Sequence, residues 1–199
     1  SSSEQKRITY NAKRLTKGED GYWENKAKNI SARTNISAEM AIEGFYYLEI
    51  SLETFTKVSG LTFSKSTYGQ VQLVIHDKPE DFKIATSATS GGRCTHKAVV
   101  SESGKTDIEF HVLAGQDRSA VNFGSLISLS ELQYEFGMVF SKLCTGKTTP
   151  PEFLSRGMAD FYAGWDMRSE SYSAVTTKSV IYGNKDQIIR SLLKDQAFM

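Results

Sequence analysis

Apolar residues recur every three or four positions in the segment that follows Ser37, and Gly60 closes this pattern. The spacing matches the turn of an α-helix, so these side chains form one apolar stripe along a single helix face. The members of the stripe are Ala41, Phe45, Leu48, Leu52 and Phe55. We therefore expect one long amphipathic helix in the N-terminal part of the chain, ending at Gly60.

Between Leu61 and Ala114 the pattern changes to short runs rich in β-branched and aromatic residues. Turn-forming segments separate these runs, among them Pro79 and the sequences SGGRC and ESGKT. Strands are predicted for residues 70–76, 97–102 and 107–114, and the N-terminal sequence RITYNA predicts another short strand. Three or four strands after a long helix indicate an α+β fold with one small twisted mixed sheet.

The second half of the chain returns to helical spacing. A helix over residues 128–143 is predicted from an apolar side made of Leu126, Leu129, Leu132, Phe136, Val139, Phe140 and Leu143. Turn-forming residues then interrupt the pattern, and a helix is predicted for about residues 151–164. The segment NKDQIIRSLLKDQ, residues 184–196, predicts a last helix. The C-terminal part is therefore expected to be mainly helical.

Composition excludes several classes of protein. A length of 199 residues suits a single domain over residues 1–199, and 39% hydrophobic with 24% charged residues is ordinary for a globular chain. A formal net charge of +1 does not favour a nucleic-acid partner. We find no apolar run of about 18 residues that would span a membrane, and no spacing that indicates a cofactor. The chain begins with SSSEQKR and ends on an apolar tripeptide, as a fragment of a longer protein would.

Two cysteines and two glycosylation sequons bear on the compartment. Cys94 and Cys144 are compatible with one disulfide or with two buried thiols. The sequons begin at Asn29 and Asn35 and would accept glycans in a secreted eukaryotic protein. With these features we expect a secreted, periplasmic or cell-surface location.

The segment LQYEFGMVFSKL, residues 132–143, overlays on the zinc-helix pattern His-Glu-x-x-His. Glu135 falls on the glutamate, whereas Tyr134 and Met138 stand at the two histidines. At 100° per residue, positions 134 and 138 lie opposite the core stripe of the helix, where a zinc helix places its ligands. Gly137 between them would let a neighbouring segment approach closely.

A second motif follows in PEFLSRGMADFYAGW, residues 151–165. It resembles the second helix of the glutamate-ligand zincins, which carries a pattern like (W/F)-L-x-E-G-x-A-(D/E)-(Y/F). The matching residues are Phe153, Leu154, Gly157, Ala159, Asp160 and Phe161. Arg156 stands where the family has its third zinc ligand, a glutamate. Among these families the basic-secretory-protein-like peptidases look most similar, and the metal-free domains of lethal-factor-like toxins offer another comparison.

The resemblance implies a zincin-like fold and assigns roles to particular positions. It implies that residues 107–114 form the substrate-binding edge strand, with Phe110, His111 and Val112 along the cleft. It also implies that Tyr134, Glu135, Met138, Arg156 and Asp160 are vestigial active-site positions.

The three residues at the ligand positions depart from the zinc-binding pattern. Tyrosine can in principle bind a metal, but methionine is a poor zinc ligand and a guanidinium repels a cation. The three histidines of the chain lie far from this helix in sequence, so we expect neither a metal nor any other cofactor. Without a metal, Glu135 needs another partner, and we expect a network of Glu135, Arg156 and Asp160 to replace it.

These observations favour a catalytically inactive peptidase-like domain, a pseudopeptidase, that binds a protein or peptide; they leave its oligomeric state open. An alternative is an ADP-ribosyltransferase-like enzyme, which Gln133-x-Glu135, the segment TFSKSTYG and Arg33 or Arg93 loosely resemble. Another alternative is an unrelated secreted α+β interaction domain. Metal analysis, NAD⁺ consumption and the fold itself separate the three.

Overall fold

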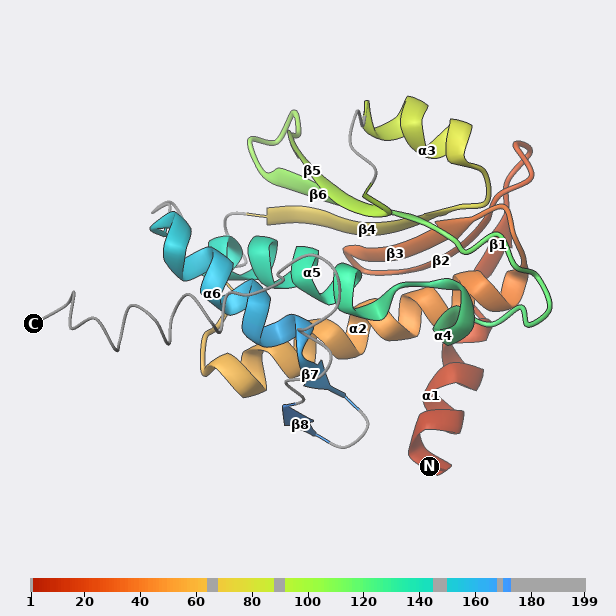
Figure 1. Cartoon of the computed structure of the whole chain (residues 1–199). Coiled ribbons are helices and arrows are strands. Elements are labelled where there is room, and N and C mark those ends of the chain that lie inside the picture. Colours follow the sequence, from red (N-terminus) through yellow and green to blue (C-terminus); the bar gives the residue numbers. More distant parts are fainter. Residues whose placement is uncertain (1, 64–67, 88–91, 145–149, 168–169, 173–199) are drawn as a thin grey trace, which may run out of the picture.

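A computed structural model describes residues 2–63, 68–87, 92–144, 150–167 and 170–172 (Figure 1). The helices in these ranges are α1 (Ser2–Ala12), α2 (Ala38–Ser59), α3 (Pro79–Thr86), α4 (Phe123–Leu126), α5 (Leu129–Cys144) and α6 (Glu152–Ala163). The strands are β1 (Leu15–Lys17), β2 (Trp23–Ala27), β3 (Ile30–Thr34), β4 (Tyr68–His76), β5 (Cys94–Val100), β6 (Thr106–Leu113), β7 (Trp165–Asp166) and β8 (Ser171–Tyr172). The α+β class expected from the sequence is confirmed.

Strands β1 to β6 form one mixed sheet in the order β1-β2-β3-β4-β6-β5. The central strands β3, β4 and β6 run parallel, while β5 runs antiparallel to β6 at the outer edge. The expectation that residues 107–114 form the edge strand is therefore wrong. That segment is β6, which has β4 on one side and β5 on the other. The strand at the edge is β5.

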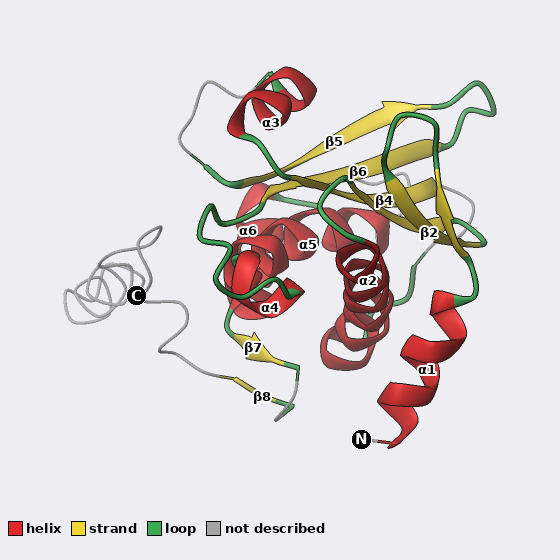
Figure 2. Cartoon of the chain, turned by 90° about the vertical axis from the view of Figure 1, so that its right-hand side faces the viewer, coloured by secondary structure: helices red, strands yellow, loops and turns green. Residues whose placement is uncertain are grey.

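The sheet separates two layers of helices (Figure 2). Helices α2 and α5 cover one face, with α6 packed against α5, while the short helix α3 lies on the opposite face. Every second strand residue points into the α2 and α5 layer, as Leu73, Ile75, Phe110 and Val112 do with no exposed surface. The main core lies between this sheet face and helices α2 and α5.

The long N-terminal helix expected from the sequence is α2. Its N-cap is Ser37, whose hydroxyl accepts the backbone N–H of Met40. Its C-cap is Gly60 in the left-handed region at φ 68°, which ends the helix as predicted. The helices predicted for 128–143 and 151–164 are confirmed as α5 and α6. The helix predicted for 184–196 lies outside the described residues.

The strand predicted for the N-terminal sequence RITYNA is wrong for an identifiable reason. The segment RITYNA forms the second half of α1 instead of a strand, because Arg7 reaches two carboxylates on α2. Its Nε lies 2.8 Å from Glu49 and its Nη2 lies 2.5 Å from Glu53. Pro79 separates two strands as expected. It does so as the first residue of helix α3, where its missing N–H costs little.

Candidate functional site

An ion-pair contact joins the edge strand β5 to helix α5. The Nδ1 atom of His96 lies 2.6 Å from Oε2 of Glu135, and the two side chains are 26% and 19% exposed. His96 faces α5 because it pairs with Phe110, whose side chain points into the same layer. A carboxylate buried to this degree is costly without a partner, and the imidazole supplies one. This pair sets β5 beside Glu135 of α5.

The outer edge of β5 carries backbone groups that the sheet does not use. At one end of the ladder Leu113 N–H donates to Arg93 C=O over 2.8 Å, and at the other Ser101 N–H donates to Lys105 C=O over 2.7 Å. Odd-numbered residues of β5 therefore bond to β6. Because bonding alternates along an antiparallel strand, the N–H and C=O groups of His96, Ala98 and Val100 point outward. In the described part of the chain β5 pairs with β6 alone.

The three residues at the ligand positions lie on the helices that the sequence predicts. Tyr134 and Met138 are half-buried on α5, away from its buried stripe. Arg156 lies on an exposed face of α6 with its side chain 59% exposed. Within the described residues we find no three His, Cys, Asp or Glu side chains placed to hold a metal ion together.

The predicted network of Glu135, Arg156 and Asp160 is wrong. Arg156 Nη2 lies 2.6 Å from Glu152 Oε1, one helical turn earlier, and Glu135 has His96 as its partner. Pairing along an exposed helix face keeps the guanidinium hydrated, whereas a move to Glu135 would cost desolvation. Asp160 is half-buried one turn further along α6. His96 is the residue that sequence reasoning missed, because 39 positions separate it from Glu135.

Close helix packing holds α5 in place, as Gly137 predicted. A Cβ atom at Gly137 would come 2.6 Å from the Cα of Ala159 on α6. Gln133, one turn before Gly137, ties three elements together: its Oε1 accepts the Tyr47 hydroxyl of α2 at 2.7 Å, and its Nε2 donates to the carbonyl of Tyr162 at 2.7 Å. The position of Glu135 is therefore set by a packed and hydrogen-bonded scaffold.

The described residues of the ADP-ribosyltransferase alternative are dispersed in the fold, and residues 64–67 of its segment TFSKSTYG lie outside the described residues. Gln133 is 5% exposed, and the oxygen and the nitrogen of its side-chain amide are both hydrogen-bonded, to the Tyr47 hydroxyl and to the Tyr162 carbonyl. Arg33 pairs with Asp20, and Arg93 donates to the carbonyl of Leu113. Arg33 alternates with the core-facing Ala32 and Thr34, so its side chain lies on the opposite face of the sheet from α5.

The two cysteines are free thiols in the structure. Cys94 lies on β5 beside the first half of α5, where burial raises the pKa of its thiol well above the ordinary value. Cys144 ends α5, and burial raises its thiol pKa to about 11. Both groups stay protonated near neutral pH, so neither is an activated nucleophile.

The three residues expected along the cleft have other positions. Phe110 and Val112 are fully buried under α5 in the interior of the sheet. His111 points to the other face, where its Nδ1 lies 2.9 Å from Nε2 of His76. Since β6 is an interior strand, its backbone is already paired on both sides.

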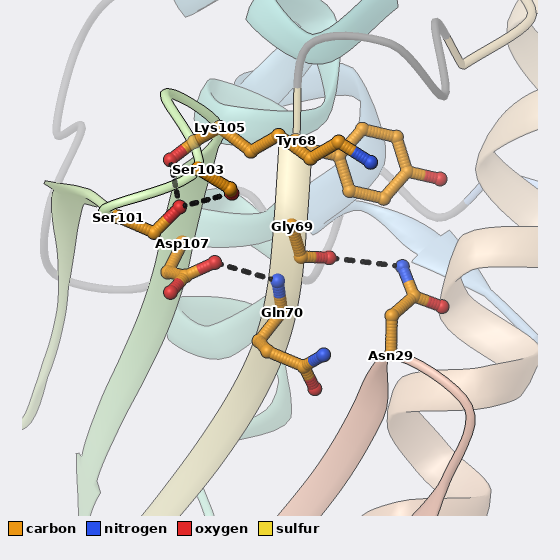
Figure 3. A pocket seen from close by; sticks show the side chains of 8 residues that line it. All are labelled: Asn29, Tyr68, Gly69, Gln70, Ser101, Ser103, Lys105 and Asp107. Atoms are coloured by element: carbon orange, nitrogen blue, oxygen red, sulfur yellow. Dashed lines mark hydrogen bonds between the residues drawn. The ribbon is translucent and has the colours of Figure 1, made fainter.

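A separate polar cavity of about 540 Å³ opens where strands β4 and β6 begin (Figure 3). Asp107 Oδ1 accepts the backbone N–H of Gln70 at 2.8 Å, and Asn29 Nδ2 donates to the carbonyl of Gly69 at 3.0 Å. A Cβ at Gly69 would lie 2.2 Å from Asp107 Oδ1, so a larger residue would displace this carboxylate. Lys105 also lines the cavity, and its side chain runs toward Tyr68 in the same view. The bonds shown in Figure 3 support the local backbone irregularity of β4 between Tyr68 and Val71.

Comparison with known proteins yields no family: no protein-family model matches the chain, and no curated protein matches it. None of the helices in the described ranges is long and apolar enough to cross a membrane. A functional assignment must therefore rest on the geometry of the chain itself.

Proposed function

We propose that the chain is a zincin-like pseudopeptidase domain that binds an extended peptide along the outer edge of β5 without a metal. The observation that carries this proposal is the 2.6 Å contact between His96 of β5 and Glu135 of α5. It joins an unpaired sheet edge to the helix that resembles a zinc helix. We call the outer edge of β5 and the adjoining part of α5 the proposed groove, and we propose that it binds without catalysis.

The arrangement of elements agrees with the resemblance. An edge strand, β5, lies beside α5, and the second motif helix, α6, packs against α5 at Gly137 and Ala159. In the zincins, which the sequence resembles, the corresponding edge strand and two helices line the substrate cleft. The sequence analysis expected residues 107–114 at the edge of the sheet. The strand at the edge is β5, and its backbone is more accessible than that of β6.

The absence of zinc follows from the chemistry of the residues present. A tyrosine, a methionine and an arginine occupy the three ligand positions, and the arginine is engaged with Glu152. In an active zincin the charge of the metal compensates the surrounding carboxylates. Here His96 compensates Glu135, so the carboxylate needs no cation.

Binding by strand addition uses only the outward backbone N–H and C=O groups of β5. The outward N–H and C=O groups of His96, Ala98 and Val100 can pair with an extended peptide, and such main-chain pairing requires no metal. Val99 and Val100 are 51% and 71% exposed, which leaves apolar surface beside this edge. An exposed edge is a ready template for another strand.

The test begins with a displayed library of random peptides selected on the wild-type chain. Isothermal titration then compares the selected peptide on wild type, Ala98→Pro and Ala98→Ser. Proline at 98 removes an outward N–H while leaving the bonds to β6 intact, so we expect at least a tenfold loss of affinity, the scale of one or two hydrogen bonds. Serine keeps the N–H and should bind as wild type does.

Three results would count against the proposal. Equal affinity for the proline and serine variants would place the peptide elsewhere on the chain. Stoichiometric zinc in the purified protein, measured by elemental analysis, would contradict a metal-free site. Absence of any selected peptide would remove the binding function, and NAD⁺ consumption would then favour the transferase alternative.

A further inference from the structure

A hydrogen-bonded chain of three titratable side chains lies on the face of the sheet that carries α3, away from the proposed groove. Glu109 Oε2 lies 3.0 Å from Nε2 of His111, and Nδ1 of His111 lies 2.9 Å from Nε2 of His76. The two imidazoles, which we call the histidine pair, stack with ring centroids 5.2 Å apart and are each 4% exposed. The proposed function leaves this cluster unused.

The order of donors along this chain leaves one buried lone pair. A carboxylate only accepts, so His111 carries its proton on Nε2 and accepts at Nδ1 from the Nε2–H of His76. The Nδ1 atom of His76 is then an acceptor, and it is buried without a hydrogen-bond partner. The next proton that enters the cluster must therefore bind His76 Nδ1, where no acceptor stands ready for the new N–H.

Helix α3 packs against His76 through Phe82. Phe82 is the buried residue of α3, and its ring meets the His76 ring at 5.6 Å in an edge-to-face contact. The helix has eight residues, no side-chain bond at its N-cap Lys78, and a C-cap at Ser87 with φ 52°, in the left-handed region that costs a serine energy. So short a helix needs its tertiary contact.

The charges around His76 do not favour a cation there. Arg33 of β3 and Lys97 of β5 face it with positive charge, and His111 of β6 would share the repulsion. Asp81 of α3 opposes them and Glu109 of β6 binds the far side of His111. Burial outweighs these carboxylates and lowers the pKa of His76 to about 4, and burial also lowers the pKa of His111.

A side-chain bond connects α3 to the edge strand. The ammonium of Lys97 donates to the carbonyl of Ala85 in the last turn of α3, where a cation also complements the helix dipole. Lys97 lies between His96 and Ala98, whose backbone groups form the proposed binding edge. Movement of α3 would therefore release a restraint on β5.

We propose that the histidine pair is an acid-sensitive latch: protonation of His76 releases α3 from the sheet and, through Lys97, loosens the edge strand β5. A lower peptide affinity in acid is expected as a consequence, and this expectation rests on the function proposed above. The latch itself is a property of the free chain and does not depend on any peptide.

Hydrogen exchange on the free chain tests the latch between about pH 7 and pH 4, the window that runs from above the ordinary histidine pKa of 6.5 down to the pKa of about 4 of His76. After correction for the intrinsic pH dependence of exchange, we expect protection of α3 and of the β5 amides to fall by about tenfold or more, the effect of one pKa unit. Histidine NMR on the same samples reports whether His76 titrates over the range where protection falls. Unchanged α3 protection in acid would overturn the proposal.

Two variants separate the steps. The double variant His76→Phe and His111→Phe cannot charge, so its α3 protection should not change with pH; if that variant fails to fold, the wild-type NMR titration still decides. Lys97→Met should keep the acid release of α3 while removing its effect on β5. Loss of β5 protection in Lys97→Met equal to that in wild type would refute the coupling. Failure of peptide selection affects the proposed function alone, since exchange is measured without peptide.

Discussion

His96 on the edge strand and Glu135 on the motif helix meet at 2.6 Å, although 39 positions separate them along the chain. The contact replaces the partner that a metal would give the carboxylate. It also fixes the distance between β5 and α5, the two walls of the proposed groove. The account of this chain as a metal-free binding domain depends on that pair.

Removal of the imidazole should destabilise the fold more than removal of the charge on its partner. His96→Ala leaves a largely buried carboxylate unpaired, so we expect a loss of about 1–3 kcal/mol in unfolding free energy. Glu135→Gln keeps a hydrogen-bonding group of the same size and should cost less. Urea unfolding of both single variants and the double variant measures the coupling, and additive effects would show that the contact contributes nothing.

The α5 and α6 crossing should not tolerate a methyl group at Gly137. Gly137→Ala forces its Cβ to within 2.6 Å of Ala159 Cα, so we expect a loss of about 1–3 kcal/mol by urea unfolding. Gly157→Ala is the matched control on α6, where an added Cβ meets open space, and it should stabilise by up to about 1 kcal/mol. The same sign for both variants would contradict the packing described.

The Tyr47 hydroxyl should contribute measurably to stability through Gln133. Tyr47→Phe keeps the ring and leaves Gln133 Oε1 buried without its 2.7 Å donor, so we expect a cost of about 1–2 kcal/mol in chemical unfolding. The neighbouring Tyr46 is half-buried, and its hydroxyl has no hydrogen bond to a described residue. Tyr46→Phe should therefore change stability by less than about 0.5 kcal/mol.

Global stability should fall in weak acid because of the histidine pair. The pKa of His76 is about 4 in the folded chain and 6.5 ordinarily, so between these values the unfolded chain binds more protons. The stabilisation is fully present above about pH 6.5 and is lost as pH falls through 4. Urea midpoints across this window should decline in wild type and decline less in His76→Phe; equal slopes would show that His76 does not cause the loss.

Long amphipathic helices could be predicted because the apolar period that marks them lies within one continuous segment of the sequence. The stripes of α2 and α5 have the helical period over several turns, and Gly60 and Gly137 have one clear physical role each. The order of strands could not be predicted, because the alternating segment of residues 107–114, DIEFHVLA, suits an interior position as well as a sheet edge. Pairing with β5 decided that question.

Contacts between distant segments account for the remaining errors. Arg7 makes RITYNA helical by binding two glutamates on α2, and no local pattern carries that information. Three vestigial positions were placed correctly on their helices, yet the partner of Glu135 came from β5. The location outside the cell and the zincin ancestry stay predictions.

Hydrogen exchange of the outward β5 amides gives the most direct test of the central claim. A library-selected peptide is added to the wild-type chain, and NMR follows the N–H groups of His96, Ala98 and Val100. Strand addition predicts that these three amides gain protection, while the inward amides of Thr95 and Lys97 are already protected by β6. Tight peptide binding that leaves the outward amides exchanging as in the free chain would contradict the account.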